Sequence, residues 1–155
     1  MTRVAQSTIR ASHPSDLAAV AALLQSGRLP IDDLATARGL KLWVLEIAGE
    51  LAGAVGLEGT SRAGGLLRSL AVAPSYQRRG LGRVLVAHVE SDARAHDIER
   101  LVLLTETAQP LFQKLGYDVI QRSEVPESLR QSAEFRSLCP VSAVCMAKTL
   151  SSGRG

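Results

Sequence analysis

Two glycines and three arginines lie close together in the stretch Gln77-Arg78-Arg79-Gly80-Leu81-Gly82-Arg83. This stretch joins an apolar segment to a region with helical periodicity. Because glycine has no Cβ, the backbone at Gly80 and Gly82 can approach a ligand closely and point successive N–H groups at it. The positive end of the following helix and the charges of the neighbouring arginines favour an anion at the same point. The stretch therefore predicts a phosphate-binding turn.

Two common phosphate-binding motifs do not fit this turn. The dinucleotide-binding fingerprint requires a third glycine at the position of Leu85, and the P-loop requires Lys-Ser or Lys-Thr where the chain has Arg83-Val84. The turn must therefore belong to another kind of phosphate site.

Arg68 and Ser69 interrupt the otherwise apolar segment 66–72. A buried guanidinium is costly unless it is paired, so Arg68 requires either a carboxylate of the protein or an anionic ligand. Glu58 or Glu46 on neighbouring strands could supply a carboxylate of the protein. We favour an anionic ligand: Arg68, with Ser69 beside it, binds the carboxylate of an amino-acid-like substrate through two parallel hydrogen bonds. Simple strand alternation places Arg68 on the same face as Leu66, Leu70 and Val72.

Hydrophobic periodicity predicts the elements that position these residues. It indicates strands over residues 4–10, 40–47, 51–57, 66–72, 101–105, 117–121 and 143–148. It indicates helices that begin at Leu17 and Gly80, and shorter ones over 32–38, 108–115 and 126–131, with a flexible loop over 59–65. The Gly49 turn makes a hairpin of its two strands, and the helix from Gly80 makes a β-α-β crossover. The class is α/β with a mixed sheet.

Composition limits the kinds of protein that this chain can be. Its 155 residues, 46% of them hydrophobic, suit one domain over 1–150 with a loose tail over 151–155. No leader-like pattern or uncharged apolar run of about 18 residues occurs, so we expect a cytoplasmic protein without a membrane partner. The net charge of +3 comes from scattered arginines with few aromatics, which argues against nucleic acid. Two cysteines, Cys139 and Cys145, indicate neither a disulfide framework nor a metal site.

The stretch Gln77-Arg78-Arg79-Gly80-Leu81-Gly82 resembles the Gln/Arg-x-x-Gly-x-Gly/Ala signature of the GNAT superfamily of N-acetyltransferases. The preceding Leu70-Ala71-Val72 and the later Leu111-Phe112-Gln113-Lys114-Leu115-Gly116-Tyr117 stand in the order of that family, so the resemblance covers nearly the whole chain. It implies the GNAT fold, a mixed and mostly antiparallel central sheet flanked by helices. In that fold a splayed pair of strands holds acetyl-CoA.

The resemblance also implies acetyl-CoA as co-substrate and assigns roles to residues that match the family's motifs. The backbone of Leu70, Ala71 and Val72 would hydrogen-bond the pantetheine arm, and the N–H of Leu70 would polarise the thioester oxygen. Phe112 would pack along the arm. The pyrophosphate would lie against Gln77, Arg78, Arg79, Gly80, Leu81, Gly82 and Arg83.

Acetyl transfer to an amine also needs a base and an acid that protonates the leaving thiolate. Glu58 and Glu106, each near the end of a predicted strand, are the candidate bases, although solvated carboxylates are common at such places. Many members of the family carry a tyrosine that protonates the thiolate where this chain has Phe112, whose ring has no proton to donate. Tyr117 and water remain as the candidate acids.

The substrate is left open between three alternatives. The segment 124–148 and Leu67-Arg68-Ser69-Leu70-Ala71-Val72 resemble the arsenic-resistance-associated branch of the family, which implies a small amine and raises the question whether Cys139 or Cys145 binds an arsenical. The same stretch around Arg68 also resembles amino-acid N-acetyltransferases of the N-acetylglutamate type. A non-catalytic acyl-CoA sensor is the third alternative, because the tyrosine is missing. A small-molecule amine is the expected partner, and a homodimer stays open.

Overall fold

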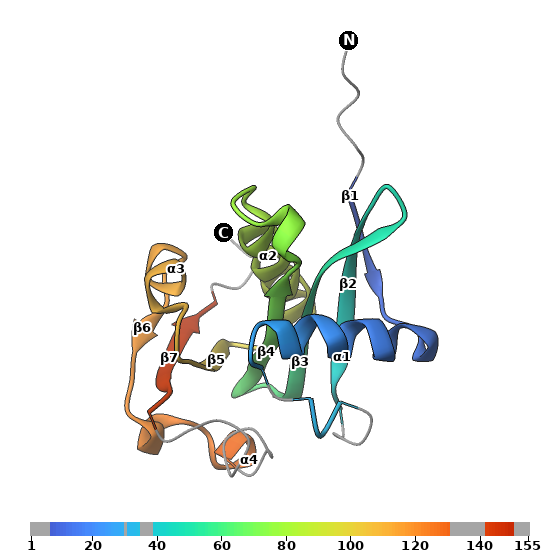
Figure 1. Ribbon diagram of the computed structural model, residues 1–155. Coiled ribbons are helices and arrows are strands. Elements are labelled where there is room, and N and C mark those ends of the chain that lie inside the picture. The colour runs from blue at the N-terminus through green and yellow to red at the C-terminus, as the bar shows by residue number, and fades with distance from the viewer. Residues whose placement is uncertain (1–6, 30, 35–38, 131–141, 151–155) are drawn as a thin grey trace.

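The computed structural model describes residues 7–29, 31–34, 39–130 and 142–150. Its centre is a seven-stranded sheet in the order β1-β2-β3-β4-β5-β7-β6 (Figure 1). Within the described residues, β4 and β5 pair in parallel and the other neighbours pair antiparallel. The expected mixed, mostly antiparallel sheet is therefore confirmed. Its strands are β1 (Ser7–Ala11), β2 (Lys41–Ile47), β3 (Glu50–Ser61), β4 (Gly64–Val72), β5 (Arg100–Thr105), β6 (Asp118–Val119) and β7 (Val144–Thr149).

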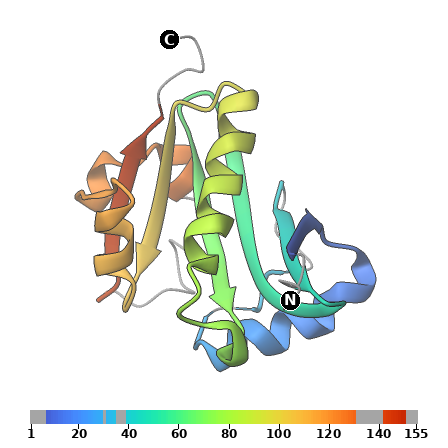
Figure 2. The ribbon, with the colours of Figure 1, turned by 90° about the horizontal axis from the view of Figure 1, so that it is seen from above.

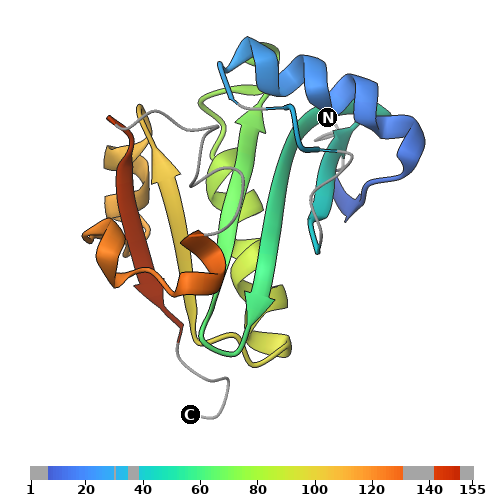
Figure 3. The ribbon, with the colours of Figure 1, turned by 90° about the horizontal axis from the view of Figure 1, so that it is seen from below.

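Helices cover both faces of the sheet, which gives three layers. Helices α2 (Leu81–Ala95) and α3 (Gln109–Lys114) lie on one face (Figure 2). Helices α1 (Leu17–Ser26) and α4 (Glu127–Arg130) lie on the other (Figure 3). No helix in the described part of the chain is long and apolar enough to cross a membrane.

Helix α2 is amphipathic and forms the main contact with the first face. Its buried apolar residues recur at helical spacing, which places one stripe of side chains against β3 and β4. Each such leucine or valine contributes about 1.5–3 kcal/mol by leaving water. The buried members of the stripe are Leu85, Val86, Val89 and Ala93. This packing fixes the start of α2 at the end of β4, where the predicted phosphate turn lies.

The loop expected over 59–65 is wrong, because β3 runs on to Ser61 and β4 begins at Gly64. The glycines that suggested flexibility instead allow close packing between strands. A Cβ on Gly65 would lie only 2.9 Å from Leu57 Cδ1, so only glycine fits there without a shift. A register shift between Glu58 and Ser61 absorbs the remaining irregularity.

Other boundaries also differ from the periodicity. Residues 32–34 of the predicted helix over 32–38 form a turn, and 35–38 lie outside the described residues. The first strand is Ser7–Ala11, and residues 4–6 of the predicted strand lie outside the described residues. Strand β6 is only Asp118–Val119, because the chain turns into a short 3₁₀ helix at Arg122. The predicted tail, 151–155, also lies outside the described residues.

Candidate active site

Strands β4 and β5 separate after a short paired region. They pair only at Gly65 with Leu101 and at Leu66 with Val102, and they diverge beyond these residues (Figure 2). The space that opens is a cavity of about 590 Å³, lined by residues 67–72 of β4 and 103–108 of β5 and the turn after it. Because β4 lacks a partner on this side, its backbone N–H and C=O groups face the cavity and can bind an amide-containing ligand.

A β-bulge in β4 shapes the middle of this wall. Ala71 pairs with Ala54 and Arg68 with Gly56, so Ser69 and Leu70 stand opposite one residue, Val55. Ser69 has a φ of 58°, which is uncommon for a residue other than glycine. In this register neither Ser69 nor Leu70 has a partner of its own on β3.

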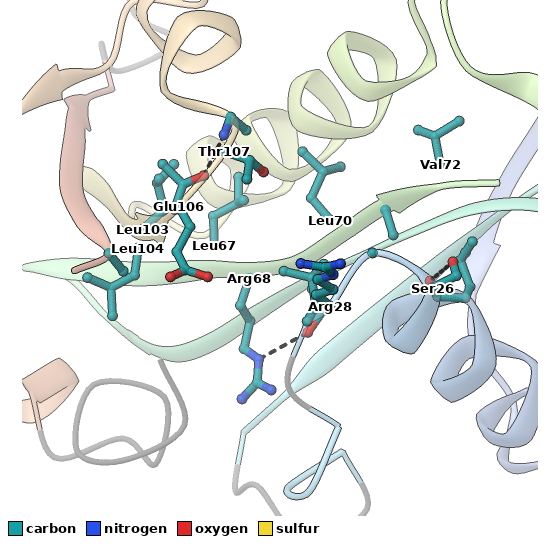
Figure 4. Close-up of a pocket in the computed structure, with 18 of the residues that line it drawn as sticks. Ser26, Arg28, Leu67, Arg68, Leu70, Val72, Leu103, Leu104, Glu106 and Thr107 are labelled. Carbon is teal, nitrogen blue, oxygen red and sulfur yellow. Dashed lines mark hydrogen bonds between the residues drawn. The ribbon is translucent and has the colours of Figure 1, made fainter. Parts of the chain in front are cut away.

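The bulge also corrects the predicted face of Arg68. Leu67 belongs to the core cluster under α2, and Leu70 and Val72 pack against that cluster. Leu66 belongs to the cluster on the opposite face. Arg68 therefore shares a face with Leu66, because the extra residue shifts the alternation. Figure 4 shows Arg68 pointing to the opposite side of β4 from Leu70 and Val72.

The predicted phosphate turn leads directly into α2. Gly80 caps the helix with a φ of 76° and provides no side-chain cap, and the first helical hydrogen bond is from Val84 N to Gly80 O at 3.2 Å. The N–H groups of Leu81, Gly82 and Arg83 are thus left for a ligand or solvent. Gln77 Nε2 donates to Val72 O at 3.0 Å, which ties the turn to β4.

The turn is electropositive. Arg78, Arg79 and Arg83 are exposed, and none of them forms an ion pair within the described residues. The Arg79 guanidinium lies 5.4 Å from the centre of the Tyr76 ring. A free cationic cluster at a helix N-terminus suits a di- or polyphosphate.

Arg68 is buried in an ion-pair cluster of the protein. It donates to both carboxylate oxygens of Asp33 at 2.6 Å and to Glu58 Oε1 at 2.7 Å, and its Nε donates to Ser69 Oγ at 3.1 Å. The guanidinium lowers the pKa of Asp33, chiefly through these hydrogen bonds. Arg68 therefore pairs with Glu58, one of the two carboxylates considered from the sequence. It also pairs with Asp33, which sequence reasoning missed.

The two candidate bases lie in different environments. Glu106 lines the cavity and its carboxylate points into the space between the strands (Figure 4), where Ser142 Oγ donates to Oε1 at 3.2 Å. Glu58 pairs with Arg68 and does not line the cavity. Thr105 Oγ1 accepts from Ala108 N at 2.9 Å and so holds the turn that carries Glu106.

Arg28 is a cavity residue that sequence reasoning missed. It follows α1, has a φ of 59° and lies across the cavity from Glu106 (Figure 4). Its guanidinium has no hydrogen-bond or ion-pair partner among the residues that the structure describes. The only signal in the sequence is an arginine directly after the Ser26-Gly27 helix end, a position that is more often solvated.

The aromatic residues divide between cavity and core. Phe112 lines the cavity, is 4% exposed and packs edge-on against Tyr117, with ring centres 5.4 Å apart. Tyr117 does not line the cavity, and its hydroxyl donates to Glu90 Oε2 at 2.9 Å. Burial, and then the charge of Glu90, raise the pKa of Tyr117. The hydroxyl of Tyr117 is thus held by Glu90 and away from the cavity.

No group of three or more His, Cys, Asp or Glu side chains within the described ranges could hold a metal ion. A family model described as an acetyltransferase (GNAT) domain matches residues 38–119. The chain belongs to the GNAT acetyltransferase family. The signature turn, the bulged β4 and the open strand pair all fall within this match, so the family expected from the sequence is confirmed.

Relatives within the GNAT family include amino-acid acetyltransferases. The enzyme of that name from Neisseria meningitidis is 30% identical in an alignment of 145 positions that covers 84% of this chain and 31% of the relative. This chain therefore spans about a third of the length of the curated relatives that it matches.

Solved structures agree with the GNAT fold. N-acetylglutamate synthase from Neisseria gonorrhoeae, complexed with coenzyme A and N-acetyl-glutamate, matches with a TM-score of 0.77 and 26% identity, over 96% of this chain and 36% of that chain. A GNAT-family acetyltransferase from Staphylococcus aureus matches with a TM-score of 0.77 and 15% identity, over 94% and 100% of the two chains, which shows the fold alone. The predicted fold class is confirmed.

Proposed function

We propose that this protein transfers the acetyl group of acetyl-CoA to the amine of a small amino-acid-like substrate. The observation that carries the proposal is that the cavity between β4 and β5 follows residues 67–72 of β4 as far as Gln77, the first residue of the turn that leads into α2. The cavity offers unpaired strand backbone, and the turn that continues from Gln77 offers helix N–H groups and arginines. Pantetheine amides suit the first and a pyrophosphate suits the second.

Acetyl-CoA would extend along β4 in this arrangement. Its pantetheine amides would pair with the backbone of Leu70, Ala71 and Val72, and its pyrophosphate would bind at residues 77–83. The thioester oxygen would accept a hydrogen bond from the N–H of Leu70, a cavity-lining residue next to the bulge at Ser69. The N-acetylglutamate synthase structure contains coenzyme A, which supports acetyl-CoA as the co-substrate.

Glu106 is the better placed of the two candidate bases, since its carboxylate faces the cavity and that of Glu58 is held by Arg68. Glu106 would take the proton of the substrate ammonium. The amine then attacks the thioester carbonyl carbon, the C–N bond forms, the nitrogen gives its second proton to water, and the C–S bond breaks with release of the CoA thiolate. Water would protonate the thiolate, because Phe112 carries no hydroxyl and that of Tyr117 is bonded to Glu90.

The substrate carboxylate would bind at Arg28. This guanidinium lies across the cavity from Glu106, so an amino acid can place its carboxylate at one wall and its amine near the other (Figure 4). Arg68, the residue selected from the sequence, remains a proposed substrate contact only if it exchanges Asp33 for the ligand. The amino-acid acetyltransferases among the relatives support an amino-acid substrate.

The arsenic-resistance alternative gains no support from the thiols. Burial raises the pKa of the Cys145 thiol to about 11, which makes it a poor ligand at neutral pH, and Cys139 lies outside the described residues. Cys145 is a free thiol, which is consistent with a reducing cytoplasm as the place of the reaction.

A substrate panel tests the proposal. The protein is incubated with acetyl-CoA and with amino acids, their decarboxylated amines and an arsenical amino acid, and release of the CoA thiol is followed. We expect turnover of an amino acid and about tenfold or greater loss of kcat/KM without its carboxylate. Arg28→Gln should remove that preference, whereas Arg62→Gln, at an exposed arginine of the β3–β4 turn, should not. Binding of acetyl-CoA without release with any amine would identify a sensor instead.

A further inference from the structure

The cavity between β4 and β5 has a closed apolar end. Leu67 and Leu103 are the first cavity-lining residues beyond the last paired residues, Leu66 and Val102. They are 2% and 1% exposed. Phe112 of α3 also lines the cavity and belongs to the same core cluster as these two leucines.

The bulge places this closed end next to the reacting centre. In a regular strand Leu67 and Leu70 would point to opposite faces, but the extra residue at Ser69 puts both on the α2 face, one after the other (Figure 4). A thioester whose oxygen is bound by the Leu70 N–H would therefore direct its acyl carbons toward Leu67 and Leu103.

From this juxtaposition we infer that Leu67, Leu103 and Phe112 limit the acyl donor to a short acyl group. The inference rests on the proposed placement of CoA along β4. The wall is rigid, because these side chains belong to the core cluster that includes Leu85, Val86 and Val89 of α2. A longer chain would have to displace packed core side chains, which is costly in an interior of crystal-like density.

Calorimetry of acyl-CoA binding tests the inference without knowledge of the acceptor. Acetyl-, propionyl- and butyryl-CoA are titrated into the wild type and into Leu103→Ala and Leu67→Ala. We expect the wild type to bind butyryl-CoA about 100-fold more weakly than acetyl-CoA, and the variants to narrow that ratio to about tenfold or less. Leu103→Val removes less volume and should narrow the ratio of the two affinities less. It replaces the alanine variants in the test if these unfold below the temperature of the measurement.

Leu85→Ala is the matched control, because Leu85 is fully buried in the same cluster but does not line the cavity. It should lower stability like Leu103→Ala and keep the wild-type ratio. Two results would overturn the inference and leave the proposed function standing. One is that the wild type binds acetyl- and butyryl-CoA with affinities within about threefold of each other. The other is that the ratio of these affinities stays unchanged in the folded variants Leu103→Ala, Leu67→Ala and Leu103→Val. If no acyl-CoA binds at all, the proposed function itself fails and the inference falls with it.

Discussion

Asp33 and Arg68 face each other edge to edge, with both carboxylate oxygens 2.6 Å from the two terminal nitrogens of the guanidinium. The two residues are 7% and 3% exposed, so the pair is buried. It joins the segment after α1 to the bulged part of β4. Since Arg28 lies in the same connection, we infer that the pair holds this wall of the cavity in place.

Loss of the pair should be visible as a pH-dependent loss of stability. The pKa of Asp33 is lowered in the folded state, so the pair contributes fully above the ordinary carboxyl pKa of about 4 and less as the pH falls through the lowered value. Asp33→Asn should therefore lower the free energy of unfolding by about 2 kcal/mol at pH 7. In acid the wild type and the variant should converge.

Urea unfolding at neutral and acid pH measures this difference. Asp32→Asn is the control, because the neighbouring Asp32 is exposed and has no ion pair within the described ranges. A constant difference between wild type and Asp33→Asn at all pH values would show that the carboxylate charge of Asp33 is not what stabilises the segment.

Gly82 tests the phosphate turn. A Cβ there would lie 3.6 Å from Leu111 Cδ2, an ordinary contact, so Gly82→Val should fold. Its side chain should nevertheless keep the pyrophosphate from the helix N–H groups and weaken acetyl-CoA binding by about tenfold or more. Ala87→Val, at an exposed position further along α2, controls for valine in the helix. Equal calorimetric affinities of Gly82→Val and wild type would remove the pyrophosphate from this turn.

The two halves of the candidate site differ in how far the sequence predicts them. The turn over 77–83 depends on neighbouring residues, so its glycines and the helix start at Leu81 could be read locally. The Arg68–Asp33 pair joins residues 35 apart, and Asp33 lies where periodicity predicted a helix. The face of Leu70 depends on a register shift against β3, which a single strand's pattern does not reveal. Arg28 was missed because only the fold brings it to the cavity.

Phe112 should affect cofactor binding more than chemistry. Its ring is buried against Tyr117 and lines the cavity but has no acidic proton. Phe112→Leu should weaken acetyl-CoA binding several-fold, on the order of 1 kcal/mol of lost contact, and leave kcat nearly unchanged. Phe112→Tyr should leave turnover intact or raise it if water is the present acid. A collapse of kcat in Phe112→Leu with acetyl-CoA affinity intact would contradict the role as a wall.

Tyr117→Phe separates a structural tyrosine from a catalytic one. The hydroxyl donates to the buried Glu90, which also pairs with Lys148 Nζ at 3.1 Å, and the raised pKa of Tyr117 keeps its proton in place at neutral pH. The variant should lose about 2 kcal/mol of unfolding free energy, because Glu90 loses one hydrogen-bond donor in a buried place. Tyr76→Phe, which loses an exposed hydrogen bond to Glu50, should lose much less.

The dependence of kcat on pH should be the same in wild type and Tyr117→Phe, since the hydroxyl does not reach the cavity. A kcat at least tenfold lower with unchanged stability would instead make Tyr117 the acid that protonates the thiolate.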